Sequence, residues 1–469
     1  MGEFDHMQDV VGQLPFLKTY SHLLLAFPLL DDVSSREEAK QRLLSASLQL
    51  AEAFPWLAAK VVQRSNGPGK SDSFHLEPCK LWSPPNTIIR FKDCSDVVPC
   101  YDDLVKARGP ASMLPGELLA PRKAFPESYH ETEEDPAPVI AFQANFVKGG
   151  LLLDCAAQHN FVDMSGIEQC YTLLATALRG EPFPDDAVAQ GNLDRRNLVP
   201  LLQAHETLLD HGQFLRPGPD NLPPPPVEPE SPFSWRYFRF SPAKLAALKA
   251  MATPGPSTTE KQTNQTNGES STPAYVSTND ALTAFCWQRV IAARLARRGT
   301  PEALAKFCRA VDARRTMGVP AGYMGDLVTI STSTIGFREL AEAPLADVAA
   351  RLRRDLTAVN NRDYVRSFAT WIDRAADKRI IAYGGRFNPD TDIGSSSWAR
   401  VRLAKVSFGP LLGQPSLVRR PNFVPLRSDI YFMPQTESGD IDALLCFNQA
   451  DFDGLMEDKI WTAYADYIG

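Results

Sequence analysis

Apolar and polar positions change their spacing near residue 159, and that change predicts a strand followed by a helix. Residues 150–157 form a short apolar run with a single charge, Asp154, which is typical of a buried strand. After Ser165, apolar residues recur every three or four positions, as on one face of a helix. His159 and Asp163 therefore lie in the connection between a strand and a helix, where catalytic side chains are often found.

The same two spacings predict elements along the rest of the chain. Apolar runs and alternation predict strands at residues 20–27, 56–62, 139–147, 235–240, 307–311, 327–335, 401–406, 428–433 and 444–448. Helical spacing predicts helices that begin near residues 35, 165, 242, 277, 344, 364 and 451. We expect Ser34 or Ser35 to cap the first of these helices, and Asp163 or Ser165 to cap the one after His159.

Two stretches of unusual composition divide the chain. Residues 215–232 hold too many prolines for a helix or a central strand and predict a stiff, extended connector. We therefore predict one domain over residues 1–214 and a second over residues 233–469. Residues 253–273 have almost no apolar side chains, which predicts a mobile surface loop within the second domain.

Composition narrows the class of protein. The 469 residues are 44% apolar and 22% charged, as in ordinary globular proteins. A net charge of -7, without any block of Lys and Arg, argues against a nucleic-acid partner. The eight cysteines include no CxxC pair, which favours buried free thiols over disulfides or a metal site. No apolar run is long enough to span a membrane, and the chain begins without a secretory pattern, so we expect a cytoplasmic protein.

Several short segments, taken in order, match the motifs of one enzyme family. They are Ala53–Ala58, His159–Asp163 as an HxxxD motif, Ser277–Trp287, Val311–Arg314 with Gly322–Asp326, and Ser396–Trp398 with Phe408–Gly409 and Gly413. With this order and spacing, nearly the whole chain resembles the BAHD superfamily of CoA-dependent acyltransferases, on the fungal branch similar to trichothecene acetyltransferase. The resemblance implies two α/β sandwich domains of the chloramphenicol-acetyltransferase type, an active-site channel at their interface and a monomeric protein.

The resemblance also implies a reaction, the transfer of an acyl group, most often acetyl, from acyl-CoA to a hydroxyl of a small secondary metabolite. An alcohol needs a base with a pKa near the working pH, and the family places His159 in that role. Asp163 either orients His159 or holds the turn, and the family favours the second. We expect no permanent cofactor and no metal, with acyl-CoA as co-substrate. Its expected contacts are Ser277, Arg314, Ser396 and Trp398.

Two places depart from the family pattern. Met164 and Ser165 stand between the aspartate of HxxxD and Gly166, which affects the turn more than the chemistry, and the larger departure is at Ser407. Ser407 stands where the family's DFGxG motif has an aspartate that pairs with the VDxR arginine, so Arg314 loses its usual carboxylate. Asp312 or Asp326 is then a candidate to replace that carboxylate, or Arg314 faces a CoA phosphate. The favoured interpretation is that Ser407 is a structural change that the fold tolerates.

Other functions stay open from the sequence alone. An amide-forming or condensation-like N-acyltransferase shares the fold and the HxxxD element, and a non-catalytic module that binds CoA or a metabolite could retain the fold. A hydrolase that uses Ser165 is least favoured, because this serine lacks a GxSxG context.

Overall fold

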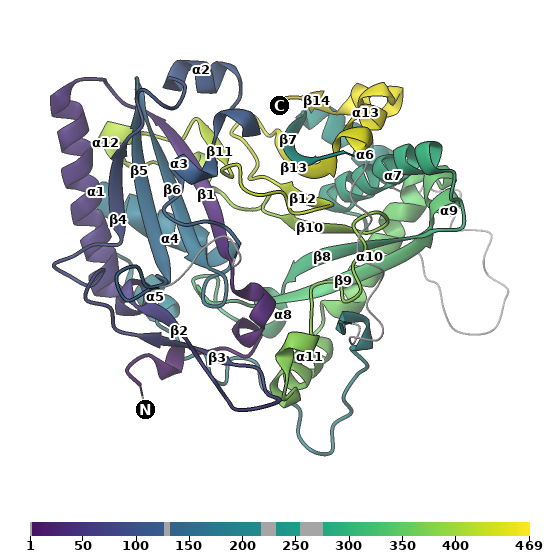
Figure 1. The fold of residues 1–469 in the computed structure, drawn as a ribbon, viewed down its shortest axis with the longest axis horizontal. Helices are drawn as coiled ribbons and strands as arrows, with labels where there is room; N and C mark the ends of the chain where they lie inside the picture. Colours follow the sequence, from purple (N-terminus) through teal and green to yellow (C-terminus); the bar gives the residue numbers. More distant parts are fainter. Residues whose placement is uncertain (1, 126–131, 217–230, 254–274) are drawn as a thin grey trace.

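Two large mixed sheets, each with its own helices, form the molecule (Figure 1). The computed structural model describes residues 2–125, 132–216, 231–253 and 275–469. The predicted loop at residues 253–273 and most of the predicted connector at residues 215–232 lie outside these ranges, so both stay predictions.

The first sheet carries His159 at the end of one of its central strands. Its strands, in spatial order, are β11 (Leu417–Arg419), β1 (Tyr20–Pro28), β6 (Gly150–Gln158), β5 (Ile140–Val147) and β4 (Ile89–Asp93). β5 and β6, both predicted as strands, form an antiparallel hairpin with Val147 opposite Gly150. The helices α1 (Val33–Ala53) and α4 (Met164–Leu178) pack on this sheet and share its apolar core.

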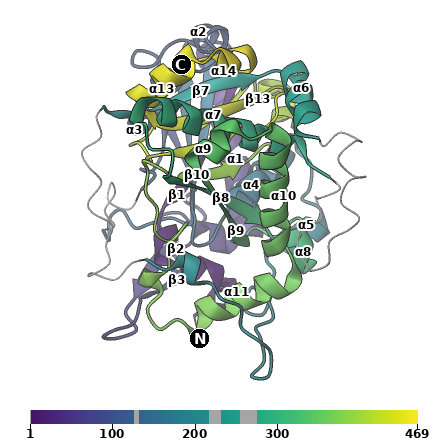
Figure 2. The ribbon, with the colours of Figure 1, turned by 90° about the vertical axis from the view of Figure 1, so that its right-hand side faces the viewer.

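The second sheet has seven strands and a separate core. Its order is β14 (Asp466–Tyr467), β7 (Phe233–Phe240), β13 (Ile441–Asn448), β12 (Asp429–Phe432), β10 (Ile393–Ser397), β8 (Leu304–Asp312) and β9 (Val328–Gly336). Its main covering helices are α6 (Pro242–Ala252), α7 (Thr278–Arg298), α9 (Phe337–Glu342) and α10 (Leu345–Val359). Figure 2 shows α7, α9 and α10 in front of the strands. Buried Trp287 and Trp461 lie in the core that these helices share with the sheet.

Smaller elements complete the described chain. They are β2 (Lys60–Arg64), β3 (Ser73–Glu77), α2 (Tyr101–Lys106), α3 (Gly116–Leu119), α5 (Asp185–Gly191), α8 (Arg314–Met317), α11 (Arg362–Arg374), α12 (Gly409–Leu412), α13 (Gln449–Glu457) and α14 (Lys459–Tyr464). No helix in the described part of the chain has the length and apolar character needed to span a membrane.

One predicted strand, residues 56–62, is confirmed only from Lys60 onward, and another, residues 401–406, is wrong. Residues 55–58 form a 3-10 helix that starts at Pro55, and a strand begins only at Lys60, because proline favours the first turn of a helix and cannot donate to a sheet. Residues 401–406 belong to no strand and contain a short 3-10 helix, Leu403–Lys405. Both segments bury apolar side chains, so their apolar runs indicate burial rather than a strand.

Helix starts also test the predicted capping residues. Asp32, not Ser34 or Ser35, caps α1, and its carboxylate accepts a hydrogen bond from the backbone N–H of Ser35 at 2.8 Å. Of the two candidates for α4, Asp163 is the cap and accepts from the N–H of Gly166 at 3.1 Å.

The two sheets do not divide the chain cleanly at the predicted connector. β11 follows that connector in sequence but pairs with β1 of the first sheet, with Arg419 opposite Leu24. The predicted domains, residues 1–214 and 233–469, therefore stay a prediction, since a strand of the second segment belongs to the first sheet.

Candidate active site

His159 follows β6 directly and precedes the first turn of α4. Its backbone N–H donates to the carbonyl of Thr19 at 2.9 Å, so the position of the residue is fixed from the neighbouring strand β1. The apolar face of α4 that the spacing predicts is buried against the sheet. Because both flanking elements are packed, the imidazole has a rigid base, while its side chain stays 26% exposed.

Asp326 holds one ring nitrogen of His159. The carboxylate accepts a hydrogen bond from Nδ1 at 3.0 Å, and its other oxygen accepts from the N–H of Val328 at 3.1 Å. A carboxylate on Nδ1 selects the tautomer in which Nε2 is free to accept a proton. Nε2 has no hydrogen-bond partner in the described part of the chain.

The same carboxylate changes the pKa of His159. Burial by itself lowers the pKa of the imidazole. The hydrogen bond and negative charge of Asp326, with a smaller effect of the Asp163 charge, outweigh burial and hold the pKa of His159 above its ordinary value. A base with a raised pKa accepts a proton more readily, provided that the pH keeps it neutral beforehand.

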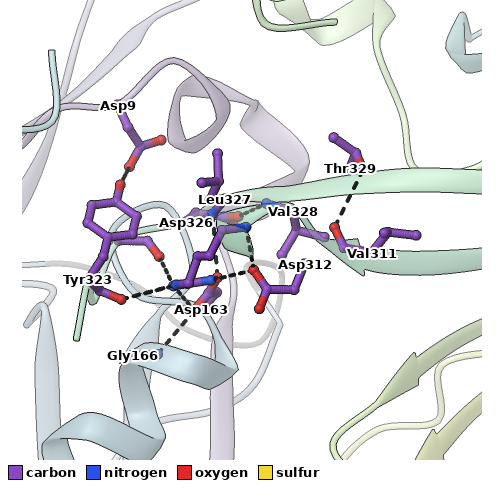
Figure 3. A network of polar contacts seen from close by, with 12 residues as sticks. Asp9, Asp163, Gly166, Val311, Asp312, Tyr323, Asp326, Leu327, Val328 and Thr329 are labelled. Carbon is purple, nitrogen blue, oxygen red and sulfur yellow. Dashed lines mark hydrogen bonds and ion pairs between the residues drawn. The ribbon is translucent and has the colours of Figure 1, made fainter. Parts of the chain in front are cut away.

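Asp163 does not contact His159 but forms a buried ion pair with Arg314. Its two oxygens accept from Nη1 and Nη2 at 2.7 and 2.8 Å, and neither residue is more than 4% exposed. Arg314 also donates to Asp312 at 3.1 Å and to the carbonyls of Tyr323 and Gly325. Figure 3 shows Asp163, Asp312 and Tyr323 close together in this network of polar contacts. Asp163 therefore joins the start of α4 to the segment between β8 and β9.

This arrangement answers the question raised by Ser407. Arg314 keeps a carboxylate partner without the family's aspartate at position 407, since Asp163 supplies both oxygens and Asp312 adds a weaker contact. The expectation that Asp326 could serve Arg314 is wrong, because Asp326 pairs with His159 instead. Each of the three side-chain nitrogens of Arg314 donates a hydrogen bond within the protein, so none is directed at a CoA phosphate.

A cavity of about 1270 Å³ lies between the two sheets and includes His159 in its wall. Residues of β1 and the start of α4 line one side, and residues of β10 and β12 line the other. A single drug-sized ligand occupies a site of roughly 300–1000 Å³, so this cavity has room for more than one small reactant.

The residues expected to contact CoA have different positions. Ser396 and Trp398 line the cavity, where the Trp398 indole donates to the Ser396 hydroxyl at 3.0 Å. Ser277 is not among the lining residues. It caps α7, where its hydroxyl accepts from the N–H of Asp280 at 3.1 Å and donates to the carboxylate of that residue. Ser396 and Trp398 thus lie where a substrate can reach them, whereas Ser277 serves the helix.

Two features of the site were missed from the sequence. Asp326 was considered as part of the GYMGD segment and as a possible partner of Arg314, and the spacing of 167 residues from His159 gave no sign that these two residues pair. Arg420, whose side chain also lines the cavity, carried no recognisable motif.

Comparison with known proteins supports the same class of site. Residues 19–178 match the trichothecene 3-O-acetyltransferase-like N-terminal domain, and residues 117–460 match the Transferase family. The chain belongs to this family, the BAHD acyltransferases.

Curated relatives match over nearly the full chain. The O-acyltransferase pigD of Monascus ruber is 48% identical over 98% of both chains. The O-acetyltransferase epaC of Aspergillus niger is 44% identical over 98% of this chain and 96% of its own. Among solved structures, TRI101 of F. graminearum in complex with coenzyme A and deoxynivalenol is 33% identical, with a TM-score of 0.87 over 98% of this chain and 99% of its own.

These matches confirm the fold class and the enzyme class expected from the sequence. The two-domain α/β fold is that of TRI101, and vinorine synthase shares it at 16% identity with a TM-score of 0.61. The predicted acyltransferase with an acyl-CoA donor is confirmed by the family and by relatives named as O-acyltransferases.

Proposed function

We propose that this BAHD acyltransferase moves an acetyl or other small acyl group from acyl-CoA to a hydroxyl of a small secondary metabolite, with His159 as general base. The observation that carries the proposal is the His159–Asp326 pair, which leaves Nε2 free in the wall of a cavity large enough for two reactants. The relatives named as O-acetyltransferases support a hydroxyl acceptor.

The chemistry needs one proton carrier. Nε2 of His159 accepts the hydroxyl proton as the acceptor oxygen attacks the thioester carbonyl carbon. The tetrahedral intermediate then breaks its carbon–sulfur bond, and the departing CoA thiolate takes the proton back from His159. During the reaction the imidazole is cationic, and Asp326 at 3.0 Å stabilises that charge. General-base assistance of this kind contributes about 10²–10⁴ in rate.

Asp163 has a positioning role in this proposal. It forms no hydrogen bond with His159, and its carboxylate is shared between Arg314 and the first turn of α4. Of the two roles that the sequence left open, the geometry supports the one that holds the turn.

Two alternative reactions fit the site less well. A hydrolase would need Ser165 as nucleophile beside a base, but Ser165 lies in the first turn of α4 and no hydrogen bond joins it to His159 in the described structure. An amide-forming reaction would use the same base, and its support is limited to the shared HxxxD element.

We further propose that the protein is a cytoplasmic monomer. All eight cysteines are free thiols and seven are buried, which suits a reducing compartment. Light scattering after size-exclusion chromatography tests the monomer, since a mass near 51.8 kDa is expected.

The test compares the wild type with His159→Ala. We expect both proteins to bind CoA in calorimetric titration, because His159 is not a proposed CoA contact. Only the wild type should acetylate members of a panel of alcohols, with product detected by mass spectrometry. A matched panel of amines separates O-transfer from N-transfer. Turnover that survives in His159→Ala removes the proposed base, and failure of both proteins to bind CoA removes the donor.

A further inference from the structure

A second polar group in the cavity wall, Arg420, lies outside the His159 site. It follows β11, and its backbone N–H donates to the hydroxyl of Tyr237 at 2.9 Å, so the main chain is fixed. Arg420 forms part of the cavity wall and is only 4% exposed.

Aromatic rings surround the Arg420 guanidinium. The ring centroids of Phe125, Trp235, Phe423 and Tyr431 lie 4.8–5.9 Å from its Cζ. The faces of aromatic rings attract a cation, but they do not supply oxygen acceptors for the N–H groups of the guanidinium. We call these four rings and Arg420 the arginine cage.

Among the described residues, no carboxylate forms an ion pair with the guanidinium of Arg420. Within the same part of the chain, its Nη1 is buried without a hydrogen bond. The preceding residue, Arg419, is equally buried but pairs with Asp442 at 2.8 Å and donates to the carbonyl of Arg108. Burying an unpaired charge costs several kcal/mol, so an arginine kept in this state calls for a ligand.

The nearby carboxylates are committed elsewhere. Asp154 pairs with His22 at 2.8 Å, and burial raises its pKa. Burial also raises the pKa of Asp429 to about 6, and Tyr431 is its hydrogen-bond donor. The positive charge of Arg420 lowers the pKa of both carboxylates from a distance, but neither forms an ion pair with its guanidinium, so among the described residues this guanidinium has no direct anionic partner.

We propose that the arginine cage is a subsite that binds a planar carboxylate on the acceptor molecule. A guanidinium offers two parallel N–H groups that match two oxygens of one plane, and the surrounding rings favour a flat group. This inference rests on the proposed transferase function of the cavity.

The position of the cage favours the acceptor over the CoA phosphates. His22 contacts the same ring, Phe423, at 4.5 Å between centroids and lies opposite Ala156 in β6. Ala156 is three residues before His159, so the strand position opposite His22 and the proposed base are about 10 Å apart at 3.3 Å per residue. The cage and His159 line the same cavity, where one acceptor can contact both, whereas the pantetheine arm holds the phosphates far from the thioester. The exposed cavity arginines, Arg315 and Arg400, suit hydrated phosphates better.

The test uses benzoate and benzamide as probes, titrated into the full chain saturated with CoA. The two differ in charge but hardly in shape. We expect wild-type protein to bind benzoate at least tenfold more tightly than benzamide, detected by calorimetry and by fluorescence of Trp235 in the cage. Arg420→Gln should abolish the preference, and Arg420→Lys should reduce it, because a lysine keeps the charge without the fork. The control Arg354→Gln removes an exposed charge on α10 and should keep the preference.

Three results would overturn the proposal. These are equal binding of both probes to wild type, a preference that survives Arg420→Gln, or benzoate that competes with CoA instead of binding beside it. Thermal unfolding of each variant establishes that it is folded, and Arg420→Lys carries the test if Arg420→Gln does not fold. This test measures binding of a probe, whereas the His159→Ala experiment measures acyl transfer. A failure of the cage proposal can therefore be told apart from a failure of the proposed function.

Discussion

The two nitrogens of His159 lie in different surroundings, and that difference sets the chemistry of the residue. Nδ1 is held by a buried carboxylate, while Nε2 faces the cavity. The carboxylate belongs to Asp326, on the other sheet's side of the site, so the base is complete only when both halves of the chain are in place.

Asp326→Asn should shift the pH profile of kcat/KM and lower its plateau. A base works only when unprotonated, so activity rises with pH through the raised pKa of His159 and levels off above it. Removing the Asp326 charge lowers that pKa and moves the acidic limb to lower pH. The lost charge-assisted hydrogen bond contributes about 1.5–3 kcal/mol, so the plateau should fall about 10- to 100-fold.

A charge control separates this effect from general electrostatics. Asp312→Asn removes a carboxylate that is 53% exposed and does not contact His159, so the limb should move much less. An acidic limb that stays in place in Asp326→Asn would show that Asp326 does not set the pKa of the base.

At the scale of elements, the Asp163–Arg314 ion pair links two parts of the chain. It joins the start of α4 to α8, the short helix after β8. Removing one partner of a buried pair leaves the other charge unsatisfied, which costs about 3–5 kcal/mol. The same carboxylate also caps α4, a contact that contributes about 1 kcal/mol.

Asp163→Ala and Arg314→Met should each lower the free energy of unfolding by several kcal/mol. The double variant should lose much less unfolding free energy than the sum of the two single losses, because it leaves neither charge of the pair buried without its partner. Urea unfolding followed by circular dichroism measures all four proteins. Asp163→Asn is the matched variant that can still cap α4 while weakening the ion pair. Additive losses would mean that the two residues act independently.

Periodicity predicted most elements near the site, and its failures have local causes. The strand and helix around His159 were predicted because both bury one continuous apolar face. The apolar runs at residues 56–59 and 401–406 are buried too, but a 3-10 turn that starts at Pro55 and irregular backbone replace strand pairing there. Spacing within one segment cannot reveal a contact such as His159 with Asp326, since the fold alone brings them together.

At the scale of the whole molecule, the cavity is shared by both sheets, and this has a kinetic consequence. Its volume of about 1270 Å³ exceeds that of a site for one small ligand, roughly 300–1000 Å³, so donor and acceptor can occupy it together. Holding both reactants beside His159 makes direct transfer possible without an acyl-enzyme.

Initial rates should therefore follow a sequential pattern. Double-reciprocal plots against acetyl-CoA, at several concentrations of an accepted alcohol, should give lines that intersect. Protein mixed with radiolabelled acetyl-CoA alone should retain no label after denaturation, because no side chain is acylated. CoA and the acceptor should also be bound at once in calorimetry. Parallel lines with a labelled protein would instead indicate a covalent intermediate, and Ser165→Ala would then test whether that serine carries it.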